Sequence, residues 1–373
     1  MYKDVSPEAR EKIVNSLCAD YLGFGPLQEV IDDEHITEIM INGPDKIYIE
    51  RDGKKMSSDV KFDNNDHLKY IIDKMMQPTG RRVDESSPYV DFALADGSRV
   101  NVILPPLSVK GATVTIRKFL RMIQSADDLV KLGTIDKRMA DFFVACIKAK
   151  VNIMFSGATG SGKTTTLEVL SSYIDPSERI ITIEDALELN LRQEHVVSLL
   201  TRPPNIEGKG EVTPRDLFCN TLRMRPTRII LGEIRGEEAM DYLQALNSGH
   251  RGSLAVIHAS NPTDTITRLE TTALYAGLNL PTWAIREQIA SGLDLIIQHE
   301  QIIDGSRKIT YVTEVESLKD NQIIMRDIFR YKIEEVTDDF CVKGRFIACN
   351  TPTFLSIFEK KGVKIDKNMF SDL

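Results

Sequence analysis

The chain has 373 residues, 42% of them hydrophobic, and a net charge of −8 at pH 7. This length suggests about two domains, since domains commonly run ~100–200 residues, and the hydrophobic content suffices for ordinary buried cores. The acidic balance argues against a surface broadly built for nucleic acid, so we expect no direct nucleic-acid partner. Five scattered cysteines without metal-ligand spacing argue against a disulfide framework or a structural zinc site.

Membrane and export signals are missing from the sequence. No stretch reaches the ~18 apolar residues of a membrane span. The opening MYKDVSPEAREKIVNSL lacks the basic-then-apolar order of a secretory signal. We therefore expect a soluble, cytoplasmic chain without a transmembrane segment, which a partner would have to bring to any membrane where it acts.

The first third of the chain predicts a small α+β domain on an antiparallel sheet. Apolar residues at near-helical spacing predict a leading helix over 7–22. Apolar runs then alternate with turn sequences such as NGPD and RDGK, and a helix is expected over NDHLKYIIDKMMQ. YVDFAL and RVNVIL predict a hairpin about Asp96-Gly97, and ATVTIRKF indicates a further strand. We assign this domain to residues 1–120. The stretch FLRMIQSADDLVKLG becomes helical and polar, so we place a linker or junction at 121–135.

Residues 136–373 predict an α/β domain with a mostly parallel sheet. The apolar runs VNIMFSG, RIITIED, RIILGEI and GSLAVIHA each end in a turn and alternate with helical segments. Such alternation is typical of a parallel sheet with helices on both faces. Residues 310–333 indicate a late hairpin, with further helices towards the C-terminus.

The strongest motif is GATGSGKT, which follows an apolar strand, precedes a helix and matches G-x-x-x-x-G-K-[ST] in full. Its glycines let the backbone N–H groups turn towards phosphate. Lys163 supplies a point charge to the outer phosphates, and the Thr164 hydroxyl is a ligand for Mg²⁺. We expect ATP and Mg²⁺ as cofactors. The predicted nucleotide-binding residues are Gly157, Ala158, Thr159, Gly160, Ser161, Gly162, Lys163, Thr164 and Thr165.

Three polar side chains each follow an apolar run later in the chain. Glu184 ends the run in ITIEDALE, and it is a candidate for polarising the attacking water. In RIILGEIRG, Gly232 stands where many phosphate-loop ATPases carry an Asp, and Glu233 comes one residue later. Glu233 is expected to reach the Mg²⁺ shell through water. His258 ends SLAVI, where it can respond to the γ-phosphate. Whether Glu184 or Glu233 takes the proton stays open.

These four elements, in this order, resemble the secretion ATPase superfamily of type II and type IV secretion systems and type IV pili. GATGSGKTTT is similar to its phosphate loop, TIEDALE to its aspartate box, LGEIRG to its atypical acidic strand and GHRGSLAVIHAS to its histidine box. GFGPLQEVIDDEHITEIMINGPDKIYIERDG, GRRVDESSPYVDFALADGSRVNVILPPLSVKGATVTIRKF and TRPPNIEGKGEVTPRDLFCNTLRMRPTRIILGEIRG resemble the CpaF (TadA) branch, which powers tight-adherence (Flp) pili.

The resemblance implies a homo-hexameric ring with a RecA-like P-loop ATPase domain. It implies that Arg99 in DGSRVN and Arg117 in TIRKF come from the first domain towards the nucleotide phosphates. Arginine suits that role because it offers planar donors. Arg202, Arg223, Arg225 and Arg235 are weaker candidates, which could line the ring interface or brace the acidic residues. The implied partners are inner-membrane platform proteins, so the chain would be peripheral at the inner face of the cytoplasmic membrane.

Two other function classes stay open. One is a DNA-linked motor, such as a conjugation ATPase or a RecA-like translocase, which would show DNA-stimulated hydrolysis with a steep salt dependence. The other is a monomeric enzyme that transfers a phosphoryl group to a small molecule. That enzyme would need an acceptor pocket, for which the sequence carries no motif.

Overall fold

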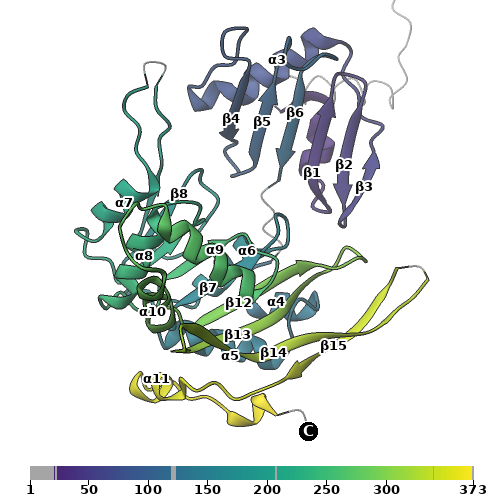
Figure 1. The fold of residues 1–373 in the computed structure, drawn as a ribbon. Coiled ribbons are helices and arrows are strands. Elements are labelled where there is room, and N and C mark those ends of the chain that lie inside the picture. Colours follow the sequence, from purple (N-terminus) through teal and green to yellow (C-terminus); the bar gives the residue numbers. More distant parts are fainter. Residues whose placement is uncertain (1–20, 22, 119–122, 206–207, 339, 372–373) are drawn as a thin grey trace, which may run out of the picture. The chain divides into compact units, whose positions relative to one another are not determined.

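The computed structural model describes residues 21, 23–118, 123–205, 208–338 and 340–371. The chain divides into two compact units, Met1–Met122 and Ile123–Leu373, which are described separately (Figure 1). The leading helix expected over 7–22 falls outside the described residues apart from Tyr21.

The first unit is built on a six-stranded sheet in the order β3-β2-β1-β6-β5-β4. All of its strand pairs are antiparallel, and β4 and β5 form the hairpin about Asp96-Gly97, as predicted. Its strands are β1 (Ile36–Asn42), β2 (Ile47–Arg51), β3 (Lys54–Ser57), β4 (Tyr89–Ala93), β5 (Arg99–Ile103) and β6 (Thr113–Arg117). Its helices are η1 (Gly25–Leu27), α2 (Gln28–Asp32), α3 (Asn65–Met76) and η2 (Gln77–Thr79).

Helix α3 and alternate residues of the strands form the core of the first unit. The Asn64 side chain caps α3 by accepting from the His67 backbone N–H. Buried α3 residues such as Ile71 and Ile72 belong to one hydrophobic cluster with Val100 of β5 and Ile116 of β6. Because strand side chains alternate between faces, the residues between these buried positions lie on the opposite face of the sheet.

The second unit contains a nine-stranded sheet in the order β15-β14-β13-β12-β7-β11-β10-β8-β9. The pairs from β12 to β9 are parallel, and the pairs from β15 to β12 are antiparallel. The mostly parallel sheet and the late hairpin (β13–β14) are as predicted. The strands are β7 (Ile153–Gly157), β8 (Ile180–Glu184), β9 (Val196–Leu200), β10 (Arg228–Leu231), β11 (Leu254–Ile257), β12 (Leu295–Gln301), β13 (Arg307–Lys319), β14 (Gln322–Val336) and β15 (Val342–Ala348).

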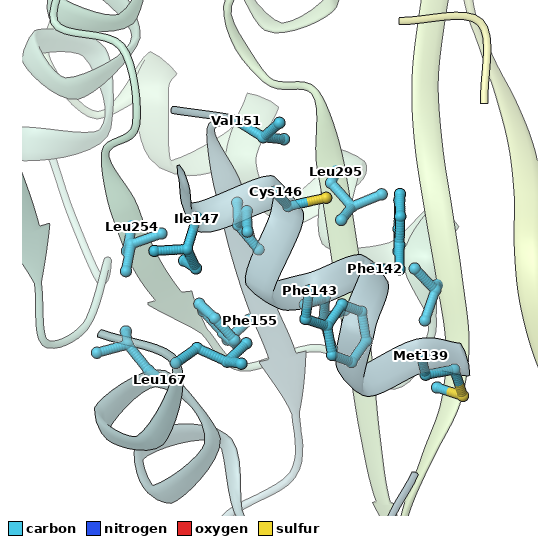
Figure 2. Packing of buried hydrophobic residues seen from close by; sticks show 14 of the residues in the cluster. Met139, Phe142, Phe143, Cys146, Ile147, Val151, Phe155, Leu167, Leu254 and Leu295 are labelled. Carbon is cyan, nitrogen blue, oxygen red and sulfur yellow. The ribbon is translucent and has the colours of Figure 1, made fainter. Parts of the chain in front are cut away.

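Helices pack on both faces of this sheet. They are α4 (Ala126–Lys131), α5 (Lys137–Lys148), α6 (Lys163–Ser171), α7 (Pro214–Thr221), α8 (Glu238–Asn247), α9 (Pro262–Leu274), α10 (Thr282–Gly292), α11 (Leu355–Lys360) and η3 (Lys367–Phe370). Phe155 of β7 belongs to the cluster with α5 and α6, whereas its neighbour Met154 belongs to the cluster with α8, α9 and α10. Figure 2 shows Phe142, Phe143 and Ile147 of α5 in one hydrophobic cluster with Phe155 of β7 and Leu167 of α6.

The expected junction at 121–135 contains structure of the second unit. Helix α4 begins with a capping box in which Ser125 and Asp128 bond each other's backbone. Ala126 and Leu129 are buried in the same cluster as α5. The polar composition of SADDLVKLG suggested a linker, but these two apolar side chains dock the helix on the sheet domain. The division between the units falls at 122/123.

Candidate active site

Four parallel strands of the second unit end at the same edge of the sheet. Strand β7 pairs with β11, β11 with β10, and β10 with β8. The phosphate loop follows β7, Glu184 is the last residue of β8, Glu233 follows β10 and His258 follows β11. Since ligands of open α/β sheets bind at the carboxyl ends of the strands, the structure brings the predicted residues of the second unit to one candidate site.

The phosphate loop curls through its glycines. Gly160 (φ +78°) and Gly162 (φ +99°) have left-handed backbone conformations that favour glycine. Lys163 is only 5% exposed, and its Nζ donates to the carbonyls of Gly157 at 2.9 Å and Ala158 at 2.7 Å. Helix α6 begins at Lys163, so its positive dipole end faces the loop. This strand–loop–helix geometry is that of an anion-binding cradle.

Glu184 is a buried carboxyl group at the end of β8, only 4% exposed. Its Oε1 accepts from the backbone N–H groups of Glu188 at 3.0 Å and Leu189 at 2.9 Å. Its Oε2 is buried and has no hydrogen-bond partner among the described residues. Burial raises the pKa of Glu184 to about 7, against the lowering effect of the two backbone donors. The group therefore changes its protonation near neutral pH.

Glu233 lies in a different electrostatic setting. Its Oε1 is 3.2 Å from His258 Nε2, and its Oε2 accepts from Arg235 Nη2 at 2.6 Å. Burial raises the pKa of Glu233, but the hydrogen bonds from His258 and Arg235 outweigh this and lower the pKa to about 2. Glu233 is therefore ionised at neutral pH.

Arg235 joins the ends of two strands. It donates to Glu233 through Nη2 and to Asp185 Oδ2 through Nη1 at 3.1 Å. Asp185 also accepts from the Thr201 hydroxyl at 3.0 Å. Arg235 thus braces the acidic residues that follow β8 and β10, the role for which it is a weaker candidate in the sequence.

The two glutamates differ by several units in pKa, although both lie at strand ends beside the phosphate loop. A carboxyl with a pKa near the working pH is suited to proton transfer, whereas a permanently ionised carboxylate is suited to a cation. Two neighbouring acidic groups whose pKa values are shifted in opposite directions commonly have separate acid–base and electrostatic roles. The arrangement can therefore support hydrolysis of a phosphate bound in the loop.

Gly232 leaves room for the Glu184 side chain. A Cβ at Gly232 would lie 2.8 Å from Glu184 Cγ, closer than real Cβ contacts come. The backbone at Gly232 is not in the left-handed region, so the restriction is the close approach and not the turn. This accounts for a glycine at the position where many phosphate-loop ATPases carry an Asp.

Gly232→Ala is expected to displace Glu184 and to lower ATP turnover by about 100-fold, the scale of a ~1 Å misplacement in an active site. ATP affinity should change little because the phosphate loop is untouched. Steady-state turnover and nucleotide titration measure the two effects. Gly236→Ala is the matched control, because its Cβ would meet only the carboxylate end of Glu238, at 3.2 Å. Normal turnover in Gly232→Ala would contradict this role.

The predicted arginines of the first unit lie opposite each other. Arg99 of β5 and Arg117 of β6 are direct cross-strand partners, and both are exposed. Arg117 also faces Glu38 of β1 across the other strand pair. All three lie on the sheet face opposite the α3 core, since their strand neighbours Val100, Ile116 and Ile39 are buried.

Two further residues, His299 and Arg307, lie beside the phosphate loop and are not predicted from the sequence. His299 of β12 pairs with Gly157, is fully buried, and has no hydrogen-bond partner for either ring nitrogen among the described residues. Burial and the charge of Lys163 lower the pKa of His299 to about 3, so its ring is neutral. Arg307 of β13 donates from Nε to the Gly160 carbonyl at 2.8 Å. Neither belongs to a motif. For His299 the sequence signal is that polar residues follow the apolar run LDLII, and Arg307 has no such signal.

Comparison with known proteins places this site in a family. The family described as Type II/IV secretion system protein matches residues 20–324. A candidate conjugal transfer protein of Mycobacterium tuberculosis is 31% identical over 302 residues, which cover 79% of this chain and 85% of that protein. Protein VirB11 of Agrobacterium fabrum is 31% identical over 302 residues, which cover 73% of this chain and 87% of VirB11.

Two solved structures have a fold similar to that of this chain. The pilus retraction motor PilT with bound ADP has a TM-score of 0.53 at 20% identity and covers 89% of this chain and 85% of its own. The Legionella pneumophila ATPase DotB has a TM-score of 0.52 at 18% identity, with 78% and 79% covered. Among the described residues, none of the helices has the length and apolar character needed to span a membrane. The chain belongs to the Type II/IV secretion system protein family and is an ATPase of the RecA-like P-loop class.

Proposed function

We propose that the chain is a hexameric motor that couples ATP hydrolysis to pilin extraction and assembly of a Flp/Tad-type (type IV-like) pilus, or to related protein secretion. The observation that carries the ATP-driven part is the phosphate loop with Glu184, Glu233 and His258 at the same sheet edge. The pilus role is supported by the three long segments that resemble the CpaF (TadA) branch. The motor would work at the inner face of the cytoplasmic membrane, on inner-membrane platform proteins.

We assign the proton transfer to Glu184 and the electrostatic role to Glu233. Glu184 has a pKa of about 7, so its ionised form can accept a proton from water at neutral pH. Lys163 would contact the outer phosphates. His258 would respond to the γ-phosphate, and its hydrogen bond to Glu233 would couple that response to the carboxylate.

The residues present fit a magnesium ion brought by ATP. Glu233 is ionised, with a pKa of about 2, and hard oxygen ligands suit Mg²⁺. No group of three or more His, Cys, Asp or Glu side chains within the described ranges could hold a metal by itself. Thr164 and, through water, Glu233 would therefore hold the ion together with the phosphates, where it would neutralise phosphate charge.

The arginine pair supports a nucleotide-sensing role for the first unit. Arg99 and Arg117 lie directly opposite each other on antiparallel strands, so their two guanidinium groups can reach one anion together. Phosphate suits two planar guanidinium groups. We propose that this pair, from a domain at residues 1–120, approaches the nucleotide of the ATPase domain and that loss of the γ-phosphate releases it.

A DNA-linked motor is the second candidate, because relatives include conjugal transfer protein TrbB of Rhizobium radiobacter, 30% identical over 295 residues. DNA-stimulated ATP hydrolysis that falls steeply with salt would favour it. The net charge of −8 argues against it, so we expect no stimulation.

Two measurements test the proposed motor. Light scattering during sizing chromatography with ATP should give six copies of the 42.0 kDa chain, and a single copy would contradict the ring. In cells, Lys163→Ala should abolish surface filaments, whereas the exposed α5 variant Lys148→Ala should retain them. Filaments in the Lys163→Ala strain would contradict the pilus role.

A further inference from the structure

The β12–β13 hairpin lies against the phosphate loop from outside the motif. Strand β12 pairs with β7, and its residue His299 lies opposite Gly157. A Cβ at Gly157 would come 2.4 Å from the His299 carbonyl oxygen. The hairpin then returns through β13, whose first residue is Arg307. The loop therefore contacts a segment far along the chain, since Arg307 and Gly160 are 147 residues apart in sequence.

Arg307 contacts two further glycines of the loop. Its Nε donates to the Gly160 carbonyl at 2.8 Å. Its Cδ would lie 3.5 Å from a Cβ at Gly162, so the side-chain stem passes beside that residue. Gly160 (φ +78°) and Gly162 (φ +99°) both have positive φ, as does Gly157 (φ +147°) at the start of the loop. Arg307 thus contacts the loop at two glycines whose positive φ angles other residues rarely adopt.

This contact bears on phosphate binding through the orientation of the peptide groups. A loop that binds anions must direct its N–H groups inward, and the carbonyls on the same peptides then point away. Lys163 donates to the carbonyls of Gly157 and Ala158. The Gly160 carbonyl has a separate donor, Arg307, whose positive charge strengthens the hydrogen bond. Because this hydrogen bond already fixes the Gly160 carbonyl, the glycine-rich loop loses less conformational entropy when the nucleotide binds.

We propose that Arg307 is a positioning residue for the nucleotide. Through the Gly160 carbonyl and the flank of Gly162, it holds the phosphate loop in its anion-receiving conformation. It acts on the loop and not on the reacting atoms, so its removal weakens nucleotide affinity more than the rate of the chemical step. The inference rests on ATP binding at the loop, and it is independent of the pilus role.

The test compares Arg307→Ala, Arg307→Lys and Arg326→Ala in the purified chain. Arg326 is a matched control, because it lies on β14 of the same sheet and pairs with Glu316. ADP affinity is measured by calorimetry, and KM and kcat by phosphate release. For Arg307→Ala we expect ADP affinity to fall about tenfold, the size of one charge-assisted hydrogen bond, with a matching rise in KM and a smaller change in kcat. Arg307→Lys, which keeps the charge and one donor, should recover part of the affinity.

Three results would overturn the proposal: wild-type ADP affinity in Arg307→Ala, a fall in kcat at unchanged KM, or an equal loss of affinity in Arg326→Ala. If Arg307→Ala does not fold, Arg307→Lys decides. An affinity between wild type and Lys163→Ala, at an unchanged melting temperature, supports the role, and wild-type affinity refutes it. Failure of wild type itself to bind ADP would instead count against the ATP site.

Discussion

Purified Lys163→Ala protein is expected to have no measurable ATP hydrolysis. Lys163 is the cationic side chain at the start of α6, it is almost fully buried, and its Nζ lies within 2.9 Å of two loop carbonyls. An alanine leaves the loop without its fixed positive charge, so both phosphate binding and charge neutralisation during cleavage are lost.

Phosphate release and ADP titration measure this outcome, and a thermal melt shows whether the variant is folded. Lys148→Ala is the control, since Lys148 is exposed at the end of α5. Wild-type turnover in a folded Lys163→Ala protein would remove the phosphate loop from the catalytic site.

Arg99→Ala and Arg117→Ala are each expected to reduce turnover steeply while nucleotide affinity falls much less. Arginine fingers of GTPases contribute roughly 10³–10⁵ in rate, an upper guide for this site. The two side chains are cross-strand partners on β5 and β6, so under the proposal one phosphate group would contact both. Arg117→Lys should rescue poorly, because lysine keeps the charge but loses the planar donors.

The exposed Arg82→Ala variant of the same unit is the control for loss of a surface arginine. If both arginines are ordinary surface residues, alanine should change stability by only a few tenths of a kcal/mol and leave turnover unchanged. Turnover, ADP affinity and melting temperature of each variant separate the two outcomes. Normal turnover in both would contradict nucleotide sensing by the first unit.

Much of the site was predictable because its residues follow local rules. The phosphate loop is a contiguous motif between a strand and a helix, and Glu184, Glu233 and His258 each end a short apolar run. Parallel strands bring such ends to one edge whatever their order. The sequence could therefore predict that these side chains gather, without predicting which strand neighbours which.

The differences between the two glutamates depended on the tertiary structure. Burial beside Gly232 raises the pKa of Glu184, and hydrogen bonds from His258 and Arg235 lower that of Glu233. Both follow apolar runs, so neither sequence context distinguishes them. The contacts of His299 and Arg307 with the loop could not be predicted either, because they depend on β12 lying next to β7 in the sheet.

Helix α4 illustrates a third limit. Its polar residues suggested a linker, yet Ala126 and Leu129 are 3% and 2% exposed. The sequence FLRMIQSADDLVKLG predicts helical, polar character, but a short helix docks through only a few apolar contacts, which do not show in the sequence which unit it packs on. The third antiparallel strand, β15, was missed for a related reason: its pattern VKGRFIA alternates weakly and contains a glycine.

The measurement that tests the central claim most directly is ATP hydrolysis by wild type and Glu184→Gln across pH 5.5–9. With a pKa of about 7, Glu184 is protonated below that value and cannot accept a proton, so wild-type kcat/KM should fall as the pH drops through about 7. Glu184→Gln should still bind ATP and remain at least as stable at pH 8, because a buried amide carries no charge, but it should lose hydrolysis at every pH. Turnover near the wild-type rate in Glu184→Gln, with the same fall towards acidic pH, would contradict the assignment of Glu184 as the proton acceptor of this ATPase.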